Sequence, residues 1–445
     1  MTKEFLKYAI PSAFSMFISA LYTIIDGIFV GRGVGDAALA AVNIVLPFTV
    51  ILVGIANMMA VGGGALVSKN IGAQKIDNAI NIFRQVCKFL LILSICISII
   101  AVIFTNQIVK LLGATDGLQS LAVDYLRYYA LFSIPNLVGI VLSSFARNDQ
   151  QPRLAMIATI LGAITNVILD YIFIFKFGLG IKGAAIATGL GQIVTVTILL
   201  PHFIKKRGYL SFGNSKLEIS NIKELLKIGF PSFFAQSSFS VIVLINNIII
   251  TKNIGEIGVS AYSIMSYIGT NIYMVLFGLT LGAQPLISYN YGKKEEHKML
   301  GFYKITCMSS IIFTAICVII CYTFGRILVQ IFTSDKEILE LAYTGLKLSC
   351  LSYFFVGLNL NTLIYYQAIE MPRYSNLICL LRSIVFLPIG LILLSKIFGI
   401  NGVWGGTIFS EAVTCLTINL ISNIKLKTLK SINKPNSNKI EIESV

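Results

Sequence analysis

Two aspartates stand within long apolar runs of this sequence. Asp26 lies near the end of a run that begins around Phe5, in "ALYTIIDGIFVGRG", and Asp170 lies in "NVILDYIFIFKFG". An ionised carboxylate at membrane depth is costly, so such a residue indicates a functional site unless it reaches water at a helix end. The first question about this chain is therefore what these two acids bind.

Polar neighbours at helical spacing accompany Asp170. Asn166 and Asp170 are four residues apart, so they share one face of a helix, and Thr188 and Gln192 have the same spacing in the next apolar segment. An amide beside a carboxylate suits a proton or a small hard cation. The spacing therefore predicts a cation-binding face rather than a catalytic one.

A comparison of the sequence with itself reveals an internal repeat. At an offset of 220 residues "YAIPSAFS" falls on "IGFPSFFA" and "GVGDAALAAVNI" falls on "NIGEIGVSAYSI", and near the C-terminal end the offset becomes 219. An offset that holds over most of the chain indicates two related halves. If each half has six spans, both enter the membrane from the same side, as in transporters whose halves enclose a central site.

The repeat is asymmetric at the acidic positions. Asp26 falls on Asn246 and Asp170 falls on Gly390. An acid needed for the folding of each half should occur in both halves, so the asymmetry indicates a proton or cation site in the N-terminal half. A third acid within an apolar segment, Glu411, belongs to the second half, where polar packing between helices and function explain it equally well.

The composition places these acids in a membrane protein. The chain has 445 residues, 56% hydrophobic and 12% charged, with a mean hydropathy of +0.83, whereas soluble domains carry about 25% charged residues. Apolar runs of about 20 residues, long enough to span a bilayer, recur from end to end. We expect an all-α polytopic membrane protein with twelve transmembrane helices in two pseudo-symmetric six-helix lobes. The expected helices are 5–30, 38–69, 80–105, 119–147, 153–176, 181–205, 222–252, 258–290, 298–324, 336–369, 373–396 and 400–424.

The basic residues predict the orientation. Most of the 35 Lys and Arg residues lie at the N-terminus, in alternate loops, in the central segment and in the C-terminal tail. By the positive-inside rule these parts are cytoplasmic, which places both termini inside the cell membrane and explains the net charge of +15 without nucleic acid. The expected division is an N-terminal six-helix lobe (1–205), a cytoplasmic linker (206–221), a C-terminal six-helix lobe (222–424) and a cytoplasmic basic tail (425–445).

The sequence offers no pattern for catalysis or for a tightly bound metal. The eight cysteines lie mostly in apolar segments without a C-x-x-C pair, and the two histidines, His202 and His297, lie near segment ends. "GRGVGDA" has no buried strand before it, and "AVGGGALVSK" lacks the ending of a phosphate-binding loop. We therefore expect no catalytic residue, no metal site and no cofactor, and hence no enzyme.

Several segments resemble the multidrug and toxic compound extrusion (MATE) family. The resemblance lies in "ALYTIIDGIFVGRGVGDAALAAVNIVLPF", "GGGALVSKNIGAQK", "QQPRLAM", "TNVILDYIFIFKFGLGIKGAAIATGLGQ" and "GINGVWGGTIFSE". These segments cover both halves, and the first and fourth are the specific ones. The resemblance implies two lobes in a V shape and alternating access, driven by inward flow of protons or sodium ions.

The resemblance also implies roles for single residues. One branch of the family has acids in the seventh span, where this sequence has Asn246 and Asn247, so a bacterial branch with the site in the N-terminal lobe is closer. The residues that match that cation site are Asp26, Asn166, Asp170 and Thr188.

Further residues are accessory candidates. Tyr125 is a weaker match to a family tyrosine that bonds the aspartate of the fifth span, and Gln192 and Glu411 are the other accessory residues. Pro11 resembles a proline at which the first helix bends in some members, and a proline does remove an intrahelical hydrogen bond.

The sequence thus predicts a secondary active antiporter. It would export amphipathic, cationic drugs or toxic organic compounds in exchange for protons or sodium ions, as a monomer in the lipid bilayer. The alternative is a lipid-linked oligosaccharide flippase of the same superfamily. That function favours cavity cations for a diphosphate, and the candidates within spans are Arg127, Lys347 and Arg382.

Overall fold

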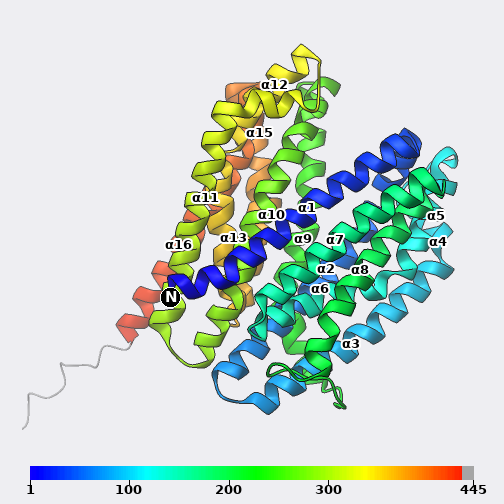
Figure 1. Cartoon of the computed structure of the whole chain (residues 1–445). Helices are drawn as coiled ribbons and strands as arrows, with labels where there is room; N and C mark the ends of the chain where they lie inside the picture. Colours follow the sequence, from blue (N-terminus) through cyan, green and yellow to red (C-terminus); the bar gives the residue numbers. More distant parts are fainter. Residues whose placement is uncertain (433–445) are drawn as a thin grey trace, which may run out of the picture.

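The computed structural model describes residues 1–432, and every regular element in that part of the chain is helical (Figure 1). The basic tail predicted at 425–445 begins inside the last helix, and residues 433–445 lie outside the described part. The elements are α1 (Thr2–Gly33), α2 (Asp36–Gly72), α3 (Ile76–Ile103), α4 (Thr105–Leu111), α5 (Asp116–Leu131), α6 (Ser133–Asn148), α7 (Pro152–Tyr171), η1 (Ile172–Lys176), α8 (Gly180–Ile204), α9 (Ile219–Asn253), α10 (Glu256–Gly292), α11 (Glu296–Gln330), α12 (Lys336–Ser349), α13 (Ser352–Ala368), α14 (Pro372–Leu380), η2 (Leu381–Val385), α15 (Phe386–Phe398) and α16 (Ile400–Ile432).

These helices fill the twelve predicted ranges. Within the described residues, nine segments are long and apolar enough to span a membrane, and two bent helix pairs raise the number to eleven. The pairs are α5 with α6, bent by 51°, and α12 with α13, bent by 46°. Helix α16 occupies the twelfth range. The sequence did not predict the bends; the first is explained by Pro135 in the first turn of α6, which cannot continue the hydrogen-bond pattern of α5.

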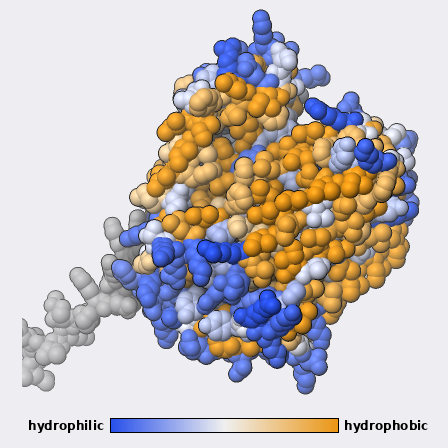
Figure 2. All heavy atoms as spheres, in the orientation of Figure 1, coloured by the Kyte–Doolittle hydropathy of each residue, from blue (hydrophilic) through white to orange (hydrophobic). Residues whose placement is uncertain are grey.

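The outer surface has the character expected in lipid. Large apolar side chains point outward, such as Ile103 (65% exposed), Phe177 (66%) and Ile319 (62%). Figure 2 shows a broad apolar surface over the helices, with hydrophilic residues gathered towards the two ends of the molecule. Soluble monomers rarely expose apolar patches larger than a few hundred Å². The chain is a multi-pass membrane protein.

The backbone repeats with the sequence. The left-handed region, with positive φ, is rarely adopted by residues other than glycine, so its positions mark tight turns. These positions recur in pairs at the predicted offsets of 220 and then 219: Gly35 with Gly255, Gln74 with Lys294, Gln150 with Glu370, and Gly180 with Gly399. The two halves therefore turn at equivalent places and form two pseudo-symmetric lobes, as predicted.

The first helix of each half packs on the opposite lobe over its N-terminal part. Phe5 and Ala9 of α1 are fully buried in a cluster with Phe302 of α11. Leu225 and Ile228 of α9 belong to the core of the N-terminal lobe. The N-terminal part of α1 therefore packs in the C-terminal lobe, and the N-terminal part of α9 packs in the N-terminal lobe. Figure 1 shows α1 crossing between the two lobes.

The lobes meet closely at the end where the linker lies. A Cβ atom at Gly72 would lie 2.0 Å from the carbonyl oxygen of Tyr289, and one at Gly292 would lie 2.0 Å from that of Lys69. The Lys69 ammonium also forms an ion pair with Glu370, at 2.6 Å from Nζ to Oε2. Since Figure 1 shows the lobes diverging towards the other end, this structure is a state closed at the linker end.

The segment between α8 and α9 is fastened to the N-terminal lobe. Arg84 Nε donates to the carbonyl oxygen of Ser211 at 3.0 Å. Asp149 receives the backbone N–H of Tyr209 at 2.7 Å, and its other oxygen lies 2.7 Å from His202 Nε2. Burial raises the pKa of Asp149, and the hydrogen bond with His202 opposes that shift. The linker is therefore an ordered part of one lobe.

The orientation of the chain can be tested with two single cysteines. Asn214 is exposed between α8 and α9, and Ser334 is exposed between α11 and α12, segments at opposite ends of the molecule (Figure 1). If the basic linker is cytoplasmic, Asn214→Cys resists an impermeant maleimide in intact cells, and Ser334→Cys reacts. Both variants are made after replacement of the eight native cysteines. The reverse labelling pattern would invert the topology.

Candidate functional site

The two predicted aspartates meet between α1 and α7. These helices pack against each other, and the carboxyl groups of Asp26 and Asp170 are close enough to interact directly. Asp170 is fully buried, and Asn166, one turn earlier on α7, is 2% exposed. The structure thus brings together acids that are far apart in the sequence, on helices of the N-terminal lobe.

Four buried oxygen atoms at this point lack a hydrogen-bond donor among the described residues. They are Asp26 Oδ1, Asn166 Oδ1 and both carboxyl oxygens of Asp170. Buried polar atoms nearly always have a partner, because an unsatisfied one loses its solvation without compensation. A donor or a positive charge brought to this point would satisfy them. A proton or a small cation with oxygen ligands fits this set of acceptors.

The charge of the pair supports the same conclusion. The ion pairs among the described residues include neither Asp26 nor Asp170. Two neighbouring carboxylates repel each other, so the doubly ionised state is unfavourable unless a cation is bound or one group takes a proton. The predicted role of this pair in binding a proton or a cation is consistent with that charge and stays a prediction.

Thr188 reaches this cluster, whereas Gln192 points elsewhere. Asn166 Nδ2 lies 3.4 Å from Thr188 Oγ1 and donates to it, so the amide oxygen of Asn166 stays available as an acceptor. Gln192, one turn later on α8, directs its side-chain oxygen at Gly139 of α6, 2.9 Å from where a Cβ would be. Thr188 thus contacts Asn166 of the acidic cluster, and the accessory role of Gln192 stays a prediction.

Three tyrosines, Tyr22, Tyr125 and Tyr129, lie close to the acids or stack on one another beside them. Tyr125, the predicted accessory residue, is 5% exposed and lies near Asp26. Its ring stacks on Tyr129 with centroids 5.9 Å apart, and the Tyr129 hydroxyl accepts a hydrogen bond from Asn136 Nδ2 at 2.7 Å. Tyr22 also faces Asp26. Sequence reasoning missed Tyr22 and Tyr129, although helical spacing from Asp26 and Tyr125 was the available signal.

Pro11 lies inside α1, and the helix continues past it to Gly33. Its missing N–H leaves the carbonyl of Lys7 without the usual intrahelical donor. The Ser15 hydroxyl donates to the Pro11 carbonyl at 2.8 Å. The weakened hydrogen-bond pattern makes this a place where α1 can bend, and that role stays a prediction.

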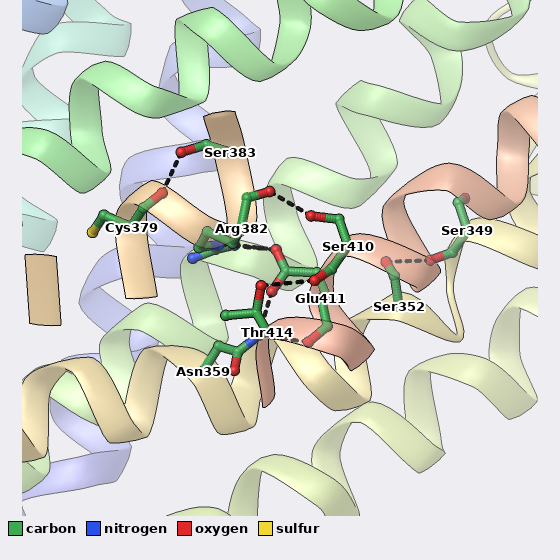
Figure 3. Close-up of polar contacts among 9 residues, drawn as sticks. All are labelled: Ser349, Ser352, Asn359, Cys379, Arg382, Ser383, Ser410, Glu411 and Thr414. Atoms are coloured by element: carbon green, nitrogen blue, oxygen red, sulfur yellow. Dashed lines mark hydrogen bonds and ion pairs between the residues drawn. The ribbon is translucent and has the colours of Figure 1, made fainter. Parts of the chain in front are cut away.

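Glu411 does not join this cluster, because it lies in the other lobe. Figure 3 shows its carboxylate between Arg382 and Asn359. Oε1 accepts from Arg382 Nε at 2.9 Å and from Nη2 at 2.6 Å, and Oε2 accepts from Asn359 Nδ2 at 2.7 Å. This carboxylate is fully paired, in contrast to the aspartates of the N-terminal lobe.

The positions equivalent to the aspartates are satisfied in the C-terminal lobe. Asn246, the counterpart of Asp26, is 3% exposed and donates from Nδ2 to the carbonyl of Ile242 in its own helix at 2.8 Å. Gly390, the counterpart of Asp170, packs closely against Phe409. The acceptor cluster therefore has no equivalent at these positions.

Comparison with protein families gives a match to both halves. The family model described as MatE matches residues 11–172 and 231–392. The two matched segments are related by the same offset of 220 that the sequence repeat shows.

Relatives and solved structures agree with this match. "Multidrug export protein MepA" of Staphylococcus saprophyticus is 26% identical over 427 residues, covering 94% of this chain and 93% of that protein. The protein of the same name from Staphylococcus aureus (strain bovine RF122) is 27% identical with the same coverage. A solved structure described as the outward-facing conformation of a multidrug resistance MATE family transporter has a TM-score of 0.92 and 23% identity over 97% of both chains, which shows a common fold.

Proposed function

This chain belongs to the MatE family of secondary transporters, which are not enzymes, and from that premise we propose that it is an antiporter for drug-like compounds. It exports amphipathic, cationic organic molecules in exchange for protons or sodium ions. One chain carries both lobes and the whole acceptor cluster, which supports action as a monomer. The names of the staphylococcal relatives support multidrug export.

The observation that carries the proposal is the set of unpartnered oxygens around Asp26 and Asp170. Such a cluster gains most from a ligand that brings positive charge, and both a coupling ion and a cationic substrate do so. Because the two ligands compete for the same lobe, binding of one favours release of the other. This competition is the thermodynamic basis of exchange.

An antiporter must also open its site to the two sides of the membrane in turn, and the arrangement of the lobes provides a basis for this. The lobes touch at the linker end and diverge at the other, so the state described here is accessible from the end away from the linker. With a cytoplasmic linker, that end faces outward, where a proton or sodium ion enters and substrate leaves. Transport then requires the backbone contacts at Gly72 and Gly292 to open.

The flippase alternative is less well supported by the charges. A diphosphate needs several cations that are not already neutralised, whereas Arg382 is paired with Glu411. Lys347 lies over the ring of Tyr343, with Nζ 4.3 Å from its centroid, and Arg127 is exposed. In the N-terminal lobe, the unpartnered atoms around Asp26 and Asp170 are acceptors, which repel a phosphate.

Purified protein in liposomes tests the proposal. Ethidium is expected to move against its own gradient when a pH gradient is imposed, or when a sodium gradient is imposed, and to stop when an ionophore removes the driving gradient. The gradient that works identifies the ion. Ethidium movement under neither gradient, with a labelled lipid-linked oligosaccharide crossing the bilayer instead, would favour the flippase.

A further inference from the structure

A cavity lies inside the C-terminal lobe, away from the aspartate cluster. It measures about 120 Å³, below the roughly 300–1,000 Å³ of pockets that enclose a whole drug. It therefore has room for part of a ligand. The residues important to its chemistry are Ser238, Tyr262, Tyr273, Tyr353, Arg382 and Glu411.

Two groups that line this cavity can donate hydrogen bonds to a ligand. Glu411 takes the Nε–H and one N–H of Nη2 from Arg382, and a guanidinium has five N–H groups in all, so three remain beyond that pair. Ser238 lines the same cavity, is 4% exposed, and its hydroxyl has no hydrogen-bond partner among the described residues. A buried, unpartnered hydroxyl in the same cavity as a guanidinium indicates a polar ligand.

The charged group is specific to this lobe. In the repeat, Glu411 corresponds to Gln192 and Arg382 to Gly162. A Cβ at Gly162 would lie 2.1 Å from Thr195 Oγ1, so the N-terminal lobe has no room for an arginine there. A buried ion pair adds little to stability compared with apolar packing. Fold symmetry and stability therefore both fail to explain why the pair is present.

Resting on the proposed export function, we propose that the C-terminal cavity is a subsite for an aromatic ring that carries a carboxylate. The ring lies among the tyrosines, and its carboxylate shares the guanidinium of Arg382 with Glu411 and accepts from Ser238.

The chemistry of the lining favours a carboxylate over a cation. Both oxygens of Glu411 already accept hydrogen bonds, from Arg382 and Asn359. Arg382 has N–H groups beyond this pair, and a planar carboxylate matches the geometry of a guanidinium. Tyrosine rings supply faces for aromatic packing. The cavity volume limits the occupant to about one ring of a larger molecule.

Two dyes that differ only at one carboxyl group test the subsite. Rhodamine 6G is an ethyl ester, and rhodamine 19 is the free acid of the same dye. Binding of each to the purified full chain is measured by fluorescence anisotropy, and the readout is the ratio of the two dissociation constants. The double variant Arg382→Gln/Glu411→Gln removes both charges together, so it leaves no unpaired buried ion. It is expected to weaken binding of the acid at least tenfold and to leave ester binding within about twofold.

The single variant Glu411→Gln is expected to change the ratio of the two dissociation constants in the opposite direction. It removes the carboxylate that competes for Arg382, so binding of the acid relative to the ester should strengthen. A merely structural ion pair would weaken both dyes together in both variants. An unchanged ratio in the double variant, with normal ester binding, would overturn the subsite and leave the export function standing. Failure of the wild type to bind either dye would count against the export function itself.

Discussion

Asp170→Asn is expected to abolish efflux against a substrate gradient, while the protein still folds and reaches the membrane. Asparagine has the shape of the carboxyl group but cannot release a proton or hold a cation by charge. Its amide N–H groups also supply a donor to the unpartnered oxygens of Asp26 and Asn166, so the cluster should not be destabilised. Asp26→Asn is expected to behave in the same way. Gradient-driven ethidium transport in liposomes measures the loss, which we expect to exceed a hundredfold.

Two controls separate coupling from general damage. Asp36→Asn changes an exposed acid in the first turn of α2, and should transport at close to the wild-type rate. Asn246→Ala changes the counterpart of Asp26 in the C-terminal lobe, whose side chain serves only its own helix, and should leave coupling intact. A wild-type rate in either aspartate variant would show that this acid is not essential, and a coupling defect in Asn246→Ala would move the site to the other lobe.

The acidic cluster could be predicted because each of its residues is recognisable from the sequence around it. Asp26 and Asp170 stand out against apolar surroundings, and Asn166 shares a helix face with Asp170 by spacing alone. Comparison of the halves then assigned both acids to one lobe. The contact between α1 and α7, by contrast, is a tertiary fact that neither segment encodes locally, and only the resemblance to a family indicated it.

The partner of Glu411 shows where this reasoning stops. Arg382 and Glu411 lie on different helices, η2 and α16, and no helical spacing relates them. From the sequence, Arg382 was a candidate cavity cation for a diphosphate, whereas the structure buries it at 8% exposure against Glu411. The sequence repeat did contain a signal for this pair. Arg382 stands where the N-terminal half has Gly162, and Glu411 stands where it has Gln192, so two opposite charges appear together in the C-terminal half alone.

Fold features that depend on packing were also beyond the sequence. The bend between α12 and α13 has no proline at its break, and the tight approach of Gly72 to Tyr289 depends on how two lobes dock. The glycine-rich stretch around residues 62–64, which lacks the ending of a phosphate-binding loop, allows close helix packing: a Cβ at Gly62 would lie 2.1 Å from the carbonyl oxygen of Leu225.

Gly72→Leu is expected to stop transport by preventing closure at the linker end. Its Cβ would lie 2.0 Å from the Tyr289 carbonyl oxygen, and neither that backbone nor α2 can move without separating the lobes. Overpacking costs about 1–3 kcal/mol or more, and about 1.4 kcal/mol is a tenfold change in an equilibrium. The closed state therefore loses population by about tenfold or more, and a transporter confined to the opposite state cannot complete its cycle.

Hydrogen exchange and a matched glycine make this prediction specific. In Gly72→Leu, peptides covering the ends of α2 and α10 should exchange faster, and Gly292→Leu, the repeat-equivalent change against Lys69, should do the same. Gly117→Leu introduces the same side chain where a Cβ meets nothing within 4 Å, and should transport normally. If Gly72→Leu and Gly292→Leu transport as well as Gly117→Leu, the two lobes do not need this backbone contact, and the linker end closes in another way during the cycle.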